Sequence, residues 1–78
     1  MKYVIIKVMD MEVPIIFSDF IDHTNFVHMK PISAGKCKVD IDPDEGVFYM
    51  VYGNSVSLKL KSRPEDAELI TNAFKFEE

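Results

Sequence analysis

Apolar and polar residues alternate along much of this chain with the two-residue period typical of β-strands. Residues 2–9 are rich in Val and Ile and apolar at both parities, which predicts a strand covered on both faces. Val13, Ile15 and Phe17 alternate with their neighbours and predict a second strand after a short hairpin. Because Pro14 has no amide hydrogen to donate, we expect this second strand at a sheet edge or with that position facing outward.

A short helix is predicted after these two strands. Ser18 offers an N-cap, and Asp19 places a carboxylate in the first turn, where the helix dipole favours negative charge. Apolar residues recur at helical spacing through residues 19–29. Pro31 ends the helix, because the residue before a proline is disfavoured in helical conformation.

The clearest structural signals lie in residues 47–76 and the strand that precedes them. Residues 47–52 are apolar on both faces, whereas residues 36–42 and 55–61 alternate and are typical of half-buried strands. Residues 43–46 begin with Pro and end with Gly, which predicts a turn between the first two of these strands.

A capped helix completes the chain. Ser62 is placed to cap it, Glu65 three residues later completes a capping box, and Pro64 suits the first turn. The helix is expected to run to residue 76 and to bury an apolar stripe made of Ala67, Leu69, Ile70, Ala73 and Phe74.

These elements predict one α+β domain over residues 1–78. Their order is two strands, a helix, three strands and a helix. Short connections favour antiparallel neighbours, so we expect a mostly antiparallel five-stranded sheet with two helices packed on it.

The central strand carries two apolar trios, one on each face. The even trio is Phe48, Met50 and Tyr52, and the odd trio is Val47, Tyr49 and Val51. If residues 43–46 form a four-residue loop, the even trio shares the core face with Cys37, and this register is preferred because the even trio buries more apolar surface. If residues 53–54 form a two-residue turn instead, the first loop must be odd and the odd trio faces the core.

The trio left outside the core predicts an interface. An exposed apolar stripe beside lysines of the flanking strands is typical of a surface that docks a partner. Under the preferred register the predicted interface contains Val47, Tyr49, Val51, Lys38 and Lys59. The other register places the even trio there.

Composition narrows the class of protein. A chain of 78 residues that is 47% hydrophobic can fold, but its core is small, and its single cysteine excludes an internal disulfide. Self-association is therefore the most available extra source of stability. The net charge of −4 disfavours nonspecific nucleic-acid binding. No signal peptide or membrane-spanning run is evident, so we expect a cytosolic protein.

Candidate chemical motifs are weak. Asp40, Asp42 and Asp44 are spaced as in a calcium loop, but the glycine and the final ligand are misplaced, so a solvated acidic hairpin is favoured. His23 and His28 lie five residues apart and share no helical face. We therefore predict no metal site, no cofactor and no catalytic residue.

Three segments resemble small uncharacterised proteins encoded by bacteriophages and prophages: residues 13–17, 52–58 and 60–70. The resemblance implies a bacterial or phage origin and supplies no activity. The favoured function is a non-enzymatic binding protein that acts through a homodimer or a host-protein interface, for example as a phage accessory factor or inhibitor. The alternative is a small-ligand or nucleotide-binding module with its pocket between sheet and helices. A small enzyme and an acidic nucleic-acid mimic are further alternatives.

Overall fold

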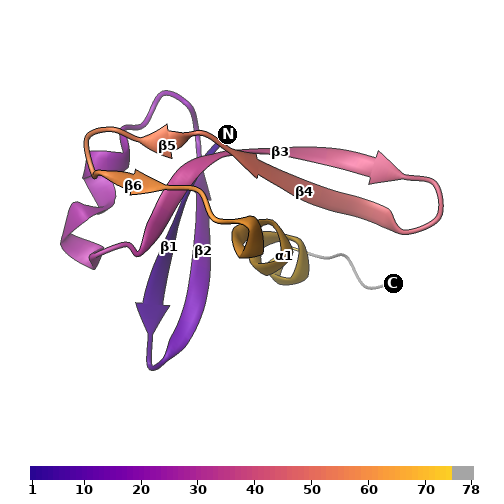
Figure 1. Ribbon diagram of the computed structural model, residues 1–78, viewed down its shortest axis with the longest axis horizontal. Helices are drawn as coiled ribbons and strands as arrows, with labels where there is room; N and C mark the ends of the chain where they lie inside the picture. The colour runs from indigo at the N-terminus through magenta and orange to yellow at the C-terminus, as the bar shows by residue number, and fades with distance from the viewer. Residues whose placement is uncertain (75–78) are drawn as a thin grey trace.

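The computed structural model describes residues 1–74 and has an α+β fold, which confirms the predicted class (Figure 1). Its elements are β1 (Lys2–Val8), β2 (Met11–Phe17), the 3₁₀ helix η1 (His23–Met29), β3 (Ser33–Asp42), β4 (Gly46–Tyr52), β5 (Asn54–Ser55), β6 (Leu60–Lys61) and α1 (Pro64–Ala73). A four-stranded antiparallel sheet has the order β2-β1-β3-β4, and β5 and β6 form a separate two-stranded sheet. The predicted five-stranded sheet is therefore wrong. The predicted end of the last helix, residues 75–76, lies outside the described residues.

The predicted strand at residues 55–61 does not exist as one strand. Gly53 has a φ of 72° and turns the chain away from β4. The Ser62 hydroxyl then donates to the Gly53 carbonyl over 2.8 Å and closes the β5–β6 hairpin on itself. Leu58 and Leu60 still pack on the sheet, but as part of a covering hairpin. The alternating pattern of residues 55–61 therefore comes from a hairpin that buries its leucines against the sheet, not from a strand of the sheet.

The predicted first helix is replaced by turns and η1. Residues 18–22 form no helix, and Phe20 is almost fully exposed. His23 and Phe26, three residues apart, both contact the ring of Phe17. A spacing of three aligns side chains in a 3₁₀ helix, so the contact with Phe17 favours that form over an α-helix.

The preferred register of the β3–β4 hairpin is also wrong. Asp42 pairs with Gly46 across residues 43–45, so the loop contains an odd number of residues. The Asp42 carboxylate accepts hydrogen bonds from the amides of Asp44 and Glu45, and Gly46 takes a φ of 88°. This turn sets the register at the loop, and the larger apolar area of the even trio does not override it. The odd trio consequently shares its face with Cys37.

Both faces of the sheet are covered near its centre. On the inner face, Tyr3, Ile5 and Cys37 pack against Ile70 of α1. On the outer face, buried residues of β1, β2 and β3 pack against Phe26 of η1 and the leucines of the β5–β6 hairpin. Figure 1 shows the β3–β4 hairpin extending past α1 and away from β1 and β2.

The register makes a direct mutational prediction. Tyr49→Glu should lower the free energy of unfolding by roughly 2–4 kcal/mol, because Tyr49 packs under α1 against the core. Met50→Glu should cost less than about 1 kcal/mol, because Met50 lies on the other face and is 41% exposed. Chemical denaturation followed by circular dichroism measures both. A larger loss of stability for Met50→Glu than for Tyr49→Glu would show that the even trio faces the core.

Candidate interaction surface

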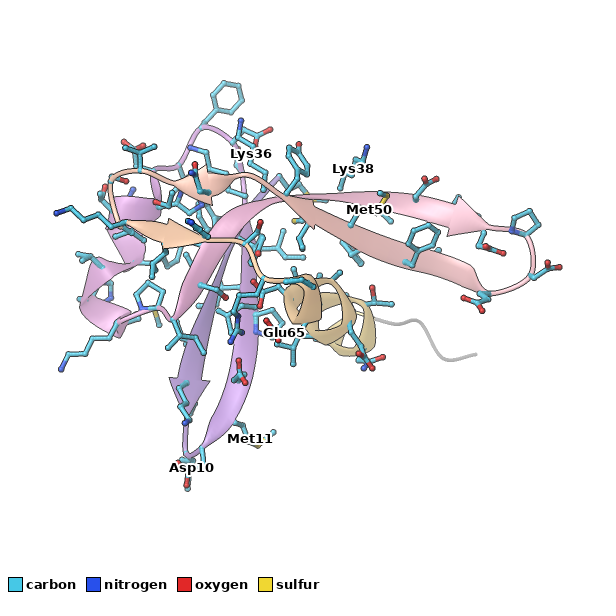
Figure 2. The ribbon with its side chains drawn as sticks, viewed as in Figure 1. Asp10, Met11, Lys36, Lys38, Met50 and Glu65 are labelled. Atoms are coloured by element: carbon cyan, nitrogen blue, oxygen red, sulfur yellow. The ribbon has the colours of Figure 1, made fainter. Side chains whose placement is uncertain are left out.

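The candidate site is the outer face of the β3–β4 hairpin beyond its covered part. We call residues 36–42 and 46–52 the arm. The outer face of the arm contains Lys36, Lys38, Asp40 and Asp42 from β3 and the even trio, Phe48, Met50 and Tyr52, from β4. Strand alternation places these residues together, because each β3 member is paired directly with an even-numbered β4 residue. Lys36, Lys38 and Met50 are labelled along the arm in Figure 2.

The outer face of the arm is accessible, and its charged side chains bind at most backbone amides among the described residues. Met50 is 41% exposed and Tyr52 is 47% exposed. Within residues 1–74, none of the four charged β3 side chains forms an ion pair. Met50 and Tyr52 are therefore exposed, and Phe48 beside them is half-buried. They lie next to charges that no other described side chain neutralises.

The structure does not bring the five predicted interface residues together. Tyr49 and Val51 pack on the inner face, where the Tyr49 amide donates to Thr71 Oγ1 over 2.8 Å. Val47 lies on that same face, nearer the tip. Lys38 is on the outer face, and Lys59 is in the turn between β5 and β6. The signal that decides between the two trios is the number of residues in the β3–β4 loop. A three-residue loop at residues 43–45 places the even trio on the outer face.

A second apolar patch lies at the tip of the inner face. It consists of Val39, Ile41 and Val47, which are 49%, 72% and 42% exposed. Tyr49 adjoins the patch on the same face, and its ring centroid is 6.1 Å from that of Phe74, the last described residue. The patch carries no charged side chain.

A buried carboxylate anchors α1 to the sheet. Asp66 is fully buried, and its Oδ2 accepts a hydrogen bond of 2.6 Å from the Tyr3 hydroxyl. The same oxygen accepts the Arg63 amide at 2.9 Å, and Oδ1 accepts Arg63 Nε at 2.9 Å. Arg63 also pairs with Glu12 of β2. Burying a carboxylate costs free energy, and that cost is offset only when both oxygens accept hydrogen bonds, as they do here.

The same contacts correct the predicted helix start. The N-cap is Arg63, not Ser62, and Asp66 at the third helical position accepts the N-cap amide. An arginine side chain has no acceptor, so only this half of a capping box exists. The sequence pattern could equally be counted from Arg63 to Asp66, but an arginine is not a usual cap, and this signal was missed.

Two buried side chains have perturbed acidity. Burial, reinforced by the hydrogen bond to Asp66, raises the pKa of the Tyr3 hydroxyl far above its usual value. Burial also raises the pKa of the Cys37 thiol. Both groups are therefore held in their protonated, neutral forms at physiological pH.

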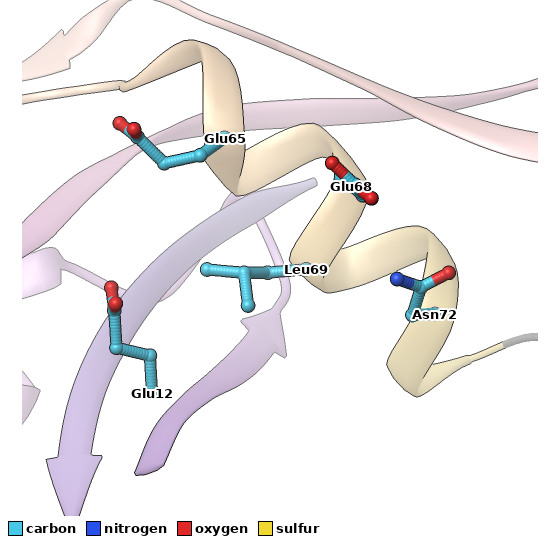
Figure 3. Close-up of a pocket in the computed structure, with 5 residues that line it drawn as sticks. All are labelled: Glu12, Glu65, Glu68, Leu69 and Asn72. Carbon is cyan, nitrogen blue, oxygen red and sulfur yellow. The ribbon is translucent and has the colours of Figure 1, made fainter. Parts of the chain in front are cut away.

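A cleft of about 230 Å³ lies between β2 and α1 (Figure 3). It is lined by Glu12, Glu65, Glu68, Leu69 and Asn72. Its volume is below the roughly 300–1,000 Å³ of ordinary ligand pockets. Two of its carboxylates, Glu12 and Glu65, pair with Arg63, and Glu68 forms no ion pair within residues 1–74.

The remaining predicted motifs have other roles in the structure. Asp42 binds turn amides. His23 is buried, and its Nε2 donates to the Gly35 carbonyl over 3.0 Å, while His28 is exposed. Among residues 1–74, no group of three or more His, Cys, Asp or Glu side chains is placed to hold a metal. No helix in that part of the chain is both long and apolar enough to span a membrane.

No protein-family model, curated protein or solved structure matches this chain. Function must therefore be argued from the chemistry of the surface itself.

The anchor predicts a large loss for a small substitution. Asp66→Asn should destabilise the fold by roughly 1–3 kcal/mol, because the buried amide offers one acceptor oxygen where the carboxylate offers two, and its NH₂ group then faces a donor. Glu65→Gln, in the same helical turn but exposed, should change stability by less than about 0.5 kcal/mol. Denaturant unfolding of the two variants measures this difference, and equal losses would show that Asp66 is not the anchor.

The raised pKa of Tyr3 predicts a loss of stability in alkali. Above the ordinary tyrosine value of 10.0, Tyr3 ionises in the unfolded chain while the folded chain keeps its proton. The unfolded state then binds fewer protons, so stability is complete below pH 10 and falls as pH rises, by up to about 1.4 kcal/mol per pH unit. Tyr3→Phe should be less stable at pH 7 and should show a shallower alkaline decline. Parallel declines in the two proteins would contradict this account.

Proposed function

We propose that this chain is a non-enzymatic binding protein that acts through a protein–protein interface on the outer face of the arm. The observation that carries the proposal is the apolar row made of exposed Met50, exposed Tyr52 and half-buried Phe48, beside charges that form no ion pair within residues 1–74. Aromatic residues and methionine are enriched at the centres of interfaces, and charged residues are typical of their rims.

The placement of reactive side chains supports binding over catalysis. The Cys37 thiol is buried and its pKa is raised by burial, which disfavours the thiolate that a nucleophile requires. The ring of His23 is buried and its Nε2 is engaged by the Gly35 carbonyl. Neither group faces a surface where substrate could reach it.

The resemblance to phage and prophage proteins supplies the proposed setting. We place the protein in the cytosol of a bacterium, where it would serve as a phage accessory factor or as an inhibitor of a host system. Its partner is then either a second copy of the chain or a host protein. An inhibitor of this kind acts stoichiometrically through a surface and needs no catalytic centre.

The cleft between β2 and α1 favours one alternative, a small-ligand-binding module. Glu12 and Glu65 pair with Arg63, so the Glu68 carboxylate is the group that favours a cationic ligand over a nucleotide, whose phosphates it would repel. Native mass spectrometry that finds a retained cationic molecule, lost on Glu68→Gln, would favour this alternative.

Site-specific photo-crosslinking tests the proposed interface. A benzophenone amino acid replaces Tyr52 on the outer face, and the protein is irradiated in bacterial cells. We expect covalent adducts with protein at position 52, because that side chain would lie within an occupied interface. Analysis of the adduct mass reports whether the partner is the chain itself or another protein.

The control is the same amino acid in place of Val56, which is 82% exposed in the β5–β6 turn. Adducts at position 52 and not at position 56 support the proposal. No adduct at position 52, or equal capture at both positions, would overturn it.

A further inference from the structure

The charges on the outer face of the arm change sign along one strand. In chain order they are Lys36, Lys38, Asp40 and Asp42. All four share a face, because they are two residues apart on an unbroken ladder. The half of the arm near the sheet centre is therefore positive, and the half near the tip is negative.

Such a pattern is complementary to itself when one copy is turned end for end. Consider a second copy stacked on the outer face, with its β3 antiparallel to the first β3 and directly over it. The two-fold axis then lies between the sheets, across the strands, at the level of Val39 and Tyr49. Lys38 faces Asp40 of the second copy, and Met50 faces Phe48 of the second copy.

We infer that the occupant of the outer face is a second copy of this chain, stacked in this antiparallel register. The inference deepens the proposed function and rests on it. Stacked sheets lie roughly 10 Å apart, a gap that a lysine from one side and an aspartate from the other close together. A stack with its axis along the strands would instead place each lysine over the apolar row of the partner.

The two parts of the surface have different roles. Removal of the even trio from water lowers the free energy of the dimer, and this drives association. Exposed ion pairs add only roughly 0.2–1 kcal/mol each, so the charges chiefly select the register. Aligned sheets cross at about 30°, which displaces the outer pair of Lys36 and Asp42 more than the central pair of Lys38 and Asp40. The central pair is therefore the one to test.

The size of the surface sets the strength of association. Each β4 strand of seven residues gives a contact roughly 23 Å long and two strands wide. This footprint is small beside the roughly 800 Å² per partner of a stable complex. The dimer is therefore concentration-dependent and weakened by salt.

Charge reversal at the central pair tests the register. Analytical ultracentrifugation at low ionic strength should show a monomer–dimer equilibrium for the natural chain. Lys38→Asp and Asp40→Lys should each weaken it about tenfold or more, because each creates two like-charge contacts in the symmetric dimer. Lys7→Asp, an exposed reversal on β1, is the matched control and should leave the equilibrium unchanged.

Two rescues make the test specific. The double variant with both reversals should dimerise again, because its aspartate at position 38 faces a lysine at position 40. An equimolar mixture of the two single variants should likewise form mixed dimers. Circular dichroism checks that every variant is folded.

The outcomes separate this inference from the proposed function. Weakened single variants together with both rescues support the register. Failure of the rescues overturns the register, and a natural chain that stays monomeric at millimolar concentration overturns the second copy as occupant. In either case, an adduct with a different protein at position 52 leaves the proposed function standing. Absence of any adduct there overturns both.

Discussion

The buried carboxylate of Asp66 is the contact on which the arrangement of sheet and helix depends. It joins the start of α1 to β1 through Tyr3, and Arg63 extends the connection to Glu12 on β2. Hydrogen bonds are directional, so this network sets where the helix begins and how it lies across the inner face. The apolar contacts of Ile70 then follow from that placement.

Fixing α1 at the sheet centre leaves the arm without a full cover. A chain of this length has one α-helix for the inner face and a short hairpin with η1 for the outer face. The hairpin and η1 cover the outer face near β1, and α1 packs against β2 and the part of β4 around Tyr49. The tip of the arm continues beyond both covers (Figure 1). An isolated two-stranded hairpin is only marginally stable in water. We have proposed the apolar row on the arm's outer face as a surface for another molecule, and the sign change along β3 is the reason for proposing a second copy.

Much of the fold could be predicted from the sequence because its signals are local. The strands β2 and β3 follow from alternation, β1 and β4 follow from short runs that are apolar on both faces, and the stop at the end of β4 follows from Gly53. The errors arose where tertiary contacts decide between local options. Packing against Phe17 favours a 3₁₀ helix, and the hydrogen bonds of Asp42 decide the parity of the loop. That parity alone determines which trio lies on the outer face, so the preferred register was wrong and the alternative register, with the even trio outside, is the one the structure has.

The central claim is that residues 1–74 leave the arm's outer face uncovered and that a second copy covers it. Hydrogen exchange of backbone amides, measured over a dilution series, tests this claim most directly. The account predicts that amides in residues 38–42 and 46–50 lose protection on dilution, while those of β1 keep theirs, because β1 is covered on both faces within the chain. Protection of the arm that stays equal to that of β1 at every concentration, in a protein shown to be monomeric, would contradict it.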